Sequence, residues 1–240
     1  MVPLRFLDSG ECLLVVEFGS SIDASLNDRV LALDAVLTEA AIPGVIETTP
    51  TFRSLAVRYE PLIVDRTRLV SRIVELERHA EVTSRASRSW TFPCCYDAPH
   101  GEDLAEVAAR LGISPERLVE LHTDRPLRVH MYGFSPGFAY LGGLPEALAA
   151  SRRAHPRRPH PADAVMIAGG MSAIAPLPMP TGWWVIGRTP ERVFASGRDP
   201  AFLVAVGDEI RFEAIDAATF AALAARAASG EAVARAEAAR

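Results

Sequence analysis

Residues 130–143 read HMYGFSPGFAYLGG and combine four glycines, four aromatic rings and one histidine within fourteen positions. Glycine permits backbone conformations and close ligand approach that other residues forbid, and Tyr and His carry a polar tip on an apolar body. We interpret this stretch as the wall of a pocket. The alternative interpretation is a tight loop held between two domains.

Short apolar segments separated by turn residues extend on both sides of this stretch. They are rich in β-branched and aromatic residues and lie at 127–134, 164–168, 183–187, 192–195 and 209–213. This texture is typical of a small β-barrel, which we place at residues 95–215. Two short helices are predicted at 102–111 and 115–121, the second opened by the capping residue Ser114 and by Pro115.

The first ninety residues alternate between the apolar period of a strand and that of a helix. Strands are predicted at 12–16, 45–49, 54–59 and 89–93. One helix is predicted after Ser25, where Asp28 completes a capping pattern, and a second helix is predicted to begin at Asp65. The order strand, helix, strand, strand, helix, strand predicts a ferredoxin-like α+β domain over residues 1–94.

The end of the chain has a different composition. Residues 216–240 contain thirteen alanines and predict a C-terminal helix that frays after Gly230. The three cysteines lack metal-ligand spacing, so we expect Cys12, Cys94 and Cys95 to be reduced and buried.

The overall composition, with 49% apolar and 23% charged side chains in 240 residues, predicts a folded globular protein. Its net charge of −5 disfavours binding to nucleic acid, which needs a basic surface. No apolar run reaches the about 18 residues of a membrane helix, and the N-terminus lacks the pattern of a secretion signal. We therefore expect a cytoplasmic protein without a membrane or nucleic-acid partner.

All 25 basic residues are arginine, because the sequence contains no lysine. A nucleotide-binding P-loop, a Schiff-base enzyme and a biotin carrier each need a lysine. Any reaction of this chain that depends on ATP or biotin therefore requires a partner chain to supply the nucleotide site or the biotinyl arm.

An arginine-rich segment follows the glycine-rich stretch. Residues 151–160 contain four arginines and two histidines without one acid, and prolines stiffen the segment. Guanidinium groups bind carboxylates and phosphates in a bidentate way, so Arg157 and Arg158 are predicted to hold a small anionic substrate. The alternative is a solvated charged loop. Arg188 is predicted to point along the barrel mouth, with a salt bridge at the barrel edge as its alternative role.

Four segments of the second half resemble one known family. They are Tyr132–Gly143, Arg152–Arg158, Val165–Gly169 and Pro180–Pro190. Three segments of the first half carry the same resemblance, namely Gly10–Val15, Ile42–Val45 and Gly101–Leu104, the last together with Leu121 and His122. The sequence is similar to the family of the B component of 5-oxoprolinase, also called the KipI or allophanate hydrolase subunit 1 family. The resemblance covers residues 4–215.

The resemblance implies an N-terminal α+β domain followed by a cyclophilin-like β-barrel. It also implies a protein that works with the A and C components of the 5-oxoprolinase complex to open 5-oxoproline to glutamate, with ATP used by the complex. Two alternative functions come with the family. One is inhibition of a histidine kinase by a KipI-like regulator, and the other is carboxyl transfer in a biotin-dependent urea-degrading system of the allophanate hydrolase type.

The predicted site residues lie within the resembling segments. His130 is the predicted acid–base group because histidine titrates at about pH 6.5, and Tyr132 and Arg188 are the other predicted catalytic residues. The predicted substrate-binding residues are Phe134, Pro136, Phe138, Tyr140, Arg157, Arg158, Gly169 and Trp183. No metal site is predicted, since no histidine is paired with another ligand at helical spacing.

The sequence departs from the family pattern at several positions. The glycine turn has Met171 and Ala175 where the family has Gln and Tyr. Asp163 stands in place of one glycine, and Thr181 replaces the first of two glycines before the tryptophan. Because the turn has lost hydrogen-bonding groups, we expect a change of substrate or rate if this turn contacts substrate.

Overall fold

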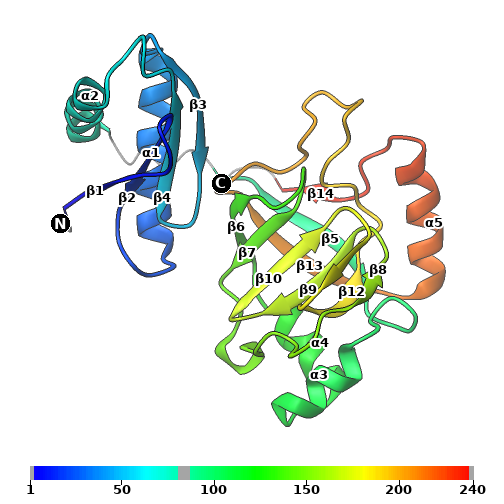
Figure 1. Ribbon diagram of the computed structural model, residues 1–240. Helices are drawn as coiled ribbons and strands as arrows, with labels where there is room; N and C mark the ends of the chain where they lie inside the picture. Colours follow the sequence, from blue (N-terminus) through cyan, green and yellow to red (C-terminus); the bar gives the residue numbers. More distant parts are fainter. Residues whose placement is uncertain (1–2, 81–86, 238–240) are drawn as a thin grey trace. The chain divides into compact units, whose positions relative to one another are not determined.

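A computed structural model describes residues 3–80 and 87–237 (Figure 1). The chain divides into two compact units, Met1–Arg85 and Ala86–Arg240. Helices and strands occur in both units, which confirms the predicted α+β class. Within the described ranges, no helix is long and apolar enough to cross a membrane.

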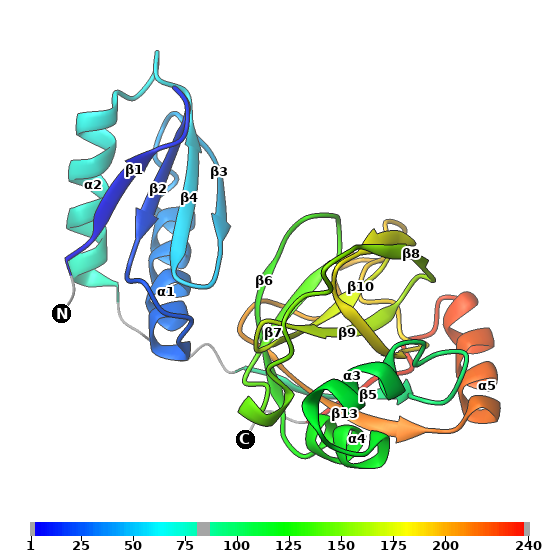
Figure 2. The ribbon, with the colours of Figure 1, turned by 60° about the horizontal axis from the view of Figure 1, so that its bottom comes forward.

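The first unit is an antiparallel sheet with two helices packed on one face (Figure 2). The strand order is β1-β2-β4-β3, with β1 at Arg5–Asp8, β2 at Leu13–Glu17, β3 at Val45–Pro50 and β4 at Ser54–Tyr59. The helices are α1 (Ala24–Ala40) and α2 (Arg66–His79). Asp65 caps α2 as predicted, but α1 is capped by Asp23, which accepts the Ser25 backbone N–H at 2.8 Å.

The strand predicted at 89–93 belongs to the second unit, which corrects the predicted domain boundary. β5 (Ser89–Cys95) pairs in parallel with β13 (Glu209–Ile215) and buries alternate side chains in the barrel core. The first sheet is instead completed at its edge by β1, which pairs antiparallel with β2. The boundary between the units therefore lies after Arg85 and not after residue 94.

The second unit contains the predicted barrel. Its strands pair in the closed order β12-β9-β10-β7-β6-β13-β5, and β5 pairs again with β12. The remaining barrel strands are β6 at Leu127–Tyr132, β7 at Ala139–Gly142, β9 at Ala164–Ala168, β10 at Met171–Ala175 and β12 at Trp184–Arg188. A two-stranded ribbon of β8 (Arg157–His160) and β11 (Met179–Thr181) accompanies them. Side chains such as Val129, Ile167 and Phe212 fill the interior.

Two helices cover one end of the barrel, α3 (Leu104–Leu111) and α4 (Pro115–Thr123), close to the predicted positions (Figures 1 and 2). Ser114 caps α4 and Pro115 occupies its first turn, as predicted. The end of the chain differs from the prediction. Helix α5 spans only Ala217–Ala228, and β14 (Arg235–Ala236) then adds to the free edge of β5.

Two smaller predictions also change. The segment 192–195 forms no named strand and makes only an isolated bridge between Phe194 and Phe202. Cys94 and Cys95 are buried free thiols as expected, whereas Cys12, in the turn just before β2, is exposed.

Candidate functional site

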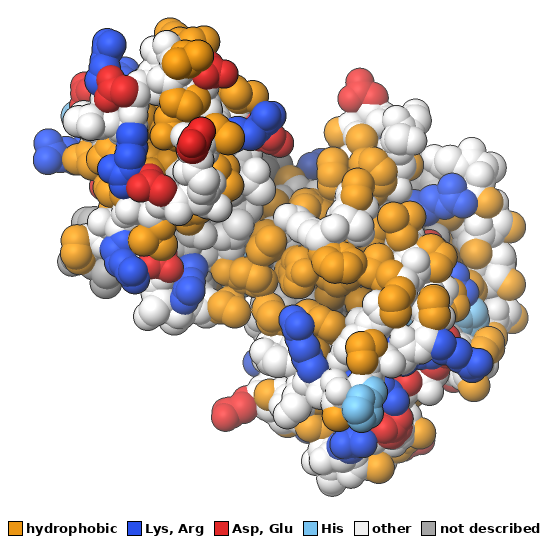
Figure 3. All heavy atoms as spheres, viewed as in Figure 1, with side chains coloured by type: hydrophobic (Ala, Val, Ile, Leu, Met, Phe, Trp, Pro, Cys, Tyr) orange, Lys and Arg blue, Asp and Glu red, His pale blue; other side chains and the backbone are white. Residues whose placement is uncertain are grey.

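The outer face of the barrel carries a second apolar cluster, distinct from the barrel core. Side chains on β9 and β10 alternate between the interior and this face, as strand geometry requires. The floor of the cluster consists of Ala164, Met166, Ala168, Ala173, Ala175 and Val185. Figure 3 shows hydrophobic side chains gathered on the barrel unit, on the side that carries β7, β9 and β10.

Aromatic side chains lie against this floor; we call Phe134, Phe138, Tyr140 and Trp183 the ring cluster. The ring centres of Phe138 and Tyr140 are 4.8 Å apart, and those of Tyr140 and Trp183 are 6.0 Å apart. Phe134 meets Phe138 edge-on at 5.7 Å. Such pairs each contribute about 0.5–1.5 kcal/mol beyond area burial. The structure thus brings together four of the predicted substrate-binding residues.

Arg152 joins the ring cluster, although nothing in its sequence context distinguishes it from the neighbouring arginines. Its guanidinium carbon lies 5.7 Å from the Trp183 ring centre, within cation–π range. Burial raises the pKa of the Tyr140 hydroxyl, and the charge of Arg152 acts in the opposite direction. Arg152 is exposed, and we find no ion pair for it in the described part of the chain. The cluster therefore presents one uncompensated positive charge beside its rings.

Phe134 is the most exposed member of the ring cluster. Its side chain is 79% exposed, and its φ of 69° lies in the left-handed region. A bulky side chain is disfavoured there, and strain of this kind often accompanies a functional position. An exposed aromatic ring on a strained backbone contributes little to the stability of the fold.

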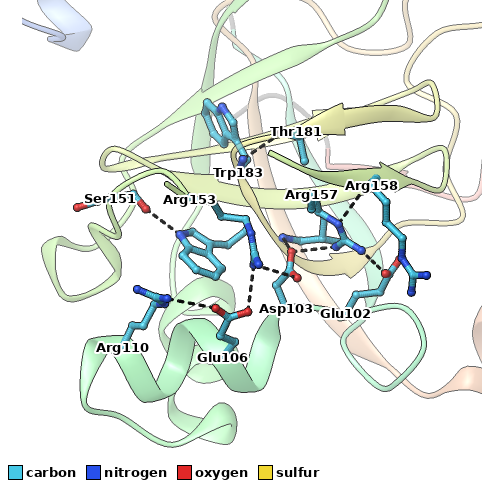
Figure 4. A network of polar contacts seen from close by, with 12 residues as sticks. Glu102, Asp103, Glu106, Arg110, Ser151, Arg153, Arg157, Arg158, Thr181 and Trp183 are labelled. Atoms are coloured by element: carbon cyan, nitrogen blue, oxygen red, sulfur yellow. Dashed lines mark hydrogen bonds and ion pairs between the residues drawn. The ribbon is translucent and has the colours of Figure 1, made fainter. Parts of the chain in front are cut away.

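Arg157 is held inside the barrel unit by acidic residues at the start of α3 (Figure 4). Its Nη1 donates to Asp103 Oδ2 at 2.9 Å, and its Nη2 pairs with Glu102. Asp103 Oδ2 also accepts the backbone N–H of Val185 at 2.8 Å, so one carboxylate joins residues 151–160, which we call the arginine loop, to α3 and β12. The Arg157 side chain is only 8% exposed, and its charge is neutralised within the chain.

Arg153 makes a parallel set of contacts in the same loop (Figure 4). Its Nη1 lies 3.3 Å from Asp103 and 3.1 Å from Glu106, and its guanidinium carbon lies 4.4 Å from the Trp184 ring centre. Arg153 and Arg157 are thus tied to the barrel unit, while most other residues of the segment are exposed. Arg158, in contrast, is exposed.

Arg188 lies at the end of β12 and away from the ring cluster. Its Nε donates to the Ala162 carbonyl at 3.0 Å, and its guanidinium carbon lies 5.3 Å from the Phe220 ring centre. Asp163 belongs to the same group, because burial raises the pKa of its carboxyl to about 7 while Arg188 acts to lower it. Burial also lowers the pKa of His100, whose ring centre lies 4.1 Å from that of Phe220 with the two rings tilted by 37°.

Of the other two predicted catalytic residues, His130 is buried and Tyr132 is partly buried against the barrel core. The Tyr132 hydroxyl donates to the Val204 carbonyl at 2.7 Å, and burial raises its pKa. His130 is buried at the irregular pairing of β6 with β7, and its ring packs so closely on Gly142 that a Cβ there would clash. Glycine at 142 is thus required by this close approach.

One family of known proteins matches most of the chain. The family model described as "Carboxyltransferase domain, subdomain C and D" matches residues 4–204. The chain belongs to this family. The match extends through both units and includes the ring cluster and the arginine loop.

Several named proteins and solved structures are similar to this chain. It is 34% identical to the B component of the 5-oxoprolinase of Bacillus subtilis (strain 168), over 85% of this chain and 89% of that protein. The crystal structure of TTHA0988 superposes with a TM-score of 0.75 at 36% identity over 85% of this chain. This chain spans only 39% of that solved chain. The urea amidolyase of K. lactis shares the fold with a TM-score of 0.77 at 12% identity, covering 98% of this chain and 16% of that one.

The structure shows the backbone conformation at one position where the sequence departs from the family pattern. Asp163, which stands where the pattern has glycine, adopts a φ of 61°. Glycine enters this region without cost, and aspartate is among the few other residues that tolerate it. At the glycine turn, Met171 packs partly buried against the outer-face cluster and Ala175 lies in its floor. Gly169 has a positive φ at that turn, and open space lies where a Cβ would stand.

The ring cluster and the predicted anion-holding arginines do not share either of two cavities in the described part of the second unit. Tyr140, Arg158 and Arg188 lie in separate groups, and none of them lines either of two cavities in the second unit. One cavity, of about 440 Å³, lies between α3, α4 and the end of β13. The other, of about 600 Å³, lies between residues 191–198 and the end of α5. Pro136 is exposed beside the ring cluster.

Sequence reasoning missed a buried polar network in the barrel interior. Tyr96 Oη lies 2.7 Å from His122 Nδ1, and His122 Nε2 lies 3.0 Å from Ser172 Oγ. Because Ser172 donates its hydrogen to the Met166 carbonyl, His122 carries its hydrogen on Nε2 and accepts from Tyr96. Burial lowers the pKa of His122 to about 3, so the imidazole is neutral at physiological pH.

Proposed function

We propose that this chain is the B component of an ATP-dependent 5-oxoprolinase complex, which cleaves the lactam of 5-oxoproline to give glutamate. The observation that carries the proposal is the 34% identity to a 5-oxoprolinase component across 85% of this chain and 89% of that relative. Similarity over nearly the full length of both proteins supports a shared role more strongly than similarity of fold, which is compatible with many functions.

The chemistry of this reaction explains why one chain is insufficient. The lactam of 5-oxoproline is an unstrained amide, so cleavage needs activation of the carbonyl oxygen and return of a proton to the leaving nitrogen. Phosphorylation of the oxygen by ATP provides that activation. This chain contains no lysine for a P-loop, so we place the nucleotide site on a partner, the A or the C component.

We assign the ring cluster and Arg152 to contact with one of these partners. Tyr, Trp and Arg are the residue types that contribute most at protein interfaces, and Phe134 is exposed on a strained backbone. The apolar floor beneath the rings holds them in fixed positions, which lowers the entropy lost on binding. Arg157, whose charge is neutralised by Glu102 and Asp103, instead fixes the arginine loop.

Reconstitution with separately purified A and C components tests the proposal. The mixture is supplied with ATP and 5-oxoproline, and glutamate is measured over time. Glutamate formation that depends on ATP and on this chain is the expected result. Carboxylation of urea with a biotin carrier, or inhibition of histidine-kinase autophosphorylation without any glutamate, would favour the carboxyltransferase or the regulatory alternative. The 12% identity to urea amidolyase concerns the fold alone and gives the carboxyltransferase alternative no specific support.

A further inference from the structure

The cavity of about 440 Å³ between α3, α4 and the end of β13 has an apolar floor. Its volume lies within the range of about 300–1,000 Å³ typical of binding sites. The floor includes Tyr96, Leu104, Val119 and Ile215, and the Tyr96 hydroxyl is engaged with His122 inside the barrel. Leu104 and Val119 pack against the barrel core, so the fold holds this floor in place.

The charged side chains that line this cavity are all acidic. Asp97 lies between β5 and α3, Glu116 and Glu120 lie on α4, and Asp216 caps α5. No arginine, histidine or lysine is among the described residues that line the cavity. A hollow lined by charge of one sign concentrates ions of the opposite sign, so this cavity fits a cation that carries an apolar body.

Most of the negative charge in this cavity is not neutralised by the chain itself. Of the four carboxylates, only Glu120 has an ion-pair partner in the described ranges, namely Arg117 at 2.9 Å on the exposed side of α4. A hydrogen bond from its own backbone lowers the pKa of the Glu116 carboxyl, and one from the Thr219 backbone lowers that of Asp216. Both carboxyl groups are therefore charged at neutral pH. A cation in this cavity would pair with charges that the chain leaves unpaired.

We propose that this cavity receives the side chain of a lysine from a partner chain, with the methylene stem on the apolar floor and the ammonium group among the carboxylates. Lysine buries its aliphatic stem along apolar surface and keeps its charged end at the rim. The proposal concerns an interface between chains, and it does not rest on the lactam chemistry of the proposed function.

The arrangement of the carboxylates favours lysine over arginine. They come from three separate parts of the fold, the connection between β5 and α3, helix α4 and the start of α5, so they approach a bound group from different directions. An ammonium group carries three donors on one compact centre, whereas the donors of a guanidinium group are confined to a plane. The sequence contains no lysine, so a second copy of this chain cannot supply the group.

Titration with a lysine side-chain probe tests this chemistry. Nα-acetyl-lysine N-methylamide is added to the isotope-labelled full chain, and the NMR shifts of the Val119 and Ile215 amides are followed. We expect saturable binding, at least tenfold weaker binding of the norleucine analogue, which lacks the ammonium group, and severalfold weaker binding of the arginine analogue. Raising the salt concentration from about 0.1 M to about 1 M should weaken binding of the lysine probe severalfold, because salt screens exposed charges.

Two variants of unchanged size each remove one negative charge from the cavity. Asp97→Asn and Glu116→Gln should each weaken binding of the lysine probe severalfold and leave binding of the norleucine analogue unchanged. Glu146→Gln, at an exposed position of the second unit outside the cavity, is the matched control and should change neither value. The side chains of Asp97 and Glu146 make no hydrogen bond with the described residues, so their replacement preserves the fold.

Carbodiimide cross-linking of this chain with the separately purified A and C components identifies the source of the lysine. The reagent joins a carboxylate directly to an amine. Because this chain contains no lysine, every lysine that is cross-linked to its acidic residues belongs to another chain. We expect one partner lysine to be joined to Asp97, Glu116 or Asp216. Replacement of that lysine with glutamine should lower the affinity between the two chains at least tenfold.

Absence of saturable binding of the lysine probe, or equal binding of the norleucine analogue, would overturn the proposal, as would tighter binding of the arginine analogue. Binding of the probe without any cross-link from the acidic residues of the cavity would indicate a free amine as the occupant and would also overturn it. If the complete mixture forms glutamate while no acidic residue of the cavity is cross-linked, the proposed function stands and the docking proposal fails. If the cross-link forms and no glutamate is made, the docking proposal stands and the proposed function fails.

Discussion

Asp163 combines a left-handed backbone with a buried carboxyl group. Burial raises the pKa of this carboxyl to about 7 in the folded chain, against about 3.9 for an exposed aspartate. The unfolded chain therefore loses this proton more readily, and folding stability falls as pH rises from about 4 to 7. The φ of 61° adds backbone strain at any pH.

We predict that Asp163→Gly stabilises the protein and that the gain grows with pH. Glycine removes both the strain and the buried charge, so the free energy of unfolding should increase by about 1–3 kcal/mol more at pH 8 than at pH 5. Denaturant unfolding at the two pH values measures this. Asp163→Asn is the control for charge alone, because asparagine also tolerates the left-handed region. A gain that is independent of pH would contradict the account.

His122 responds to pH in the opposite direction. Its folded pKa of about 3 lies below the value of about 6.5 in the unfolded chain, so its contribution to stability is complete above pH of about 6.5 and is lost as pH falls towards 3. Ser172 holds the Nε2 hydrogen of this neutral ring. The network thus depends on the ring remaining uncharged.

Ser172→Ala tests that dependence. The substitution leaves the His122 Nε2–H buried without an acceptor, which should lower the free energy of unfolding by about 1–3 kcal/mol at pH 7.5. Urea unfolding gives the value, and Ser229→Ala at the exposed end of α5 serves as the control. A change below about 0.5 kcal/mol would show that another acceptor satisfies the ring.

From the sequence alone, the arginine-rich segment could be recognised, but the residues that its arginines contact could not. It grouped Arg152, Arg153, Arg157 and Arg158 in one loop, but their roles differ. Arg157 is neutralised by Glu102 and Asp103, which lie more than fifty positions earlier, whereas Arg152 lies over Trp183. Pairing over such separations is decided by the closed barrel and leaves no periodic pattern in the sequence.

At the level of elements, Asp103 is the joint between α3, the arginine loop and β12. We predict that Asp103→Ala lowers the free energy of unfolding by about 3–5 kcal/mol, because it leaves the buried Arg157 charge and the Val185 N–H without their shared acceptor. Chemical denaturation measures the loss. Glu120→Gln in the exposed pair with Arg117 on α4 is the matched control and should cost less than about 1 kcal/mol. Comparable losses in both variants would contradict this assignment.

The loop between β6 and β7 carries the exposed Phe134 that we assign to an interface with a partner chain. Phe134→Asn should change the free energy of unfolding by less than about 1 kcal/mol, because relief of backbone strain offsets the lost contact with Phe138. The affinity of the Phe134→Asn variant for the partner chains should fall at least tenfold, as measured by biolayer interferometry. Leu62→Asn, at an exposed apolar position in the first unit, is the control. Unchanged affinity of Phe134→Asn would remove the ring cluster from the interface.

The positions of helices, which depend on local sequence patterns, were predicted correctly. The sheet to which a strand belongs, which depends on closure of the barrel, was not. Apolar spacing located the helices, and Ser114 and Asp65 marked two of their starts. The strand at 89–93 was predicted correctly as a strand and assigned to the wrong sheet, because its alternation fits either domain. Only the parallel pairing with β13, some 120 residues later, places it in the barrel.

At the scale of the whole molecule, the two units have separate apolar cores. The ring cluster and both described cavities belong to the second unit. The ring cluster lies on the outer face of the barrel. The sequence contains no lysine, so it cannot form a P-loop of the usual kind. These properties are those expected of one component of a multi-chain enzyme.

The central claim is that this chain is required for lactam cleavage by the complex. Its most direct test is the rate of glutamate formation from 5-oxoproline and ATP by the A and C components, measured with this chain present and with it omitted. The account predicts glutamate only in the complete mixture, at a rate that rises with added chain until the complex is saturated. Equal rates with and without this chain would contradict it.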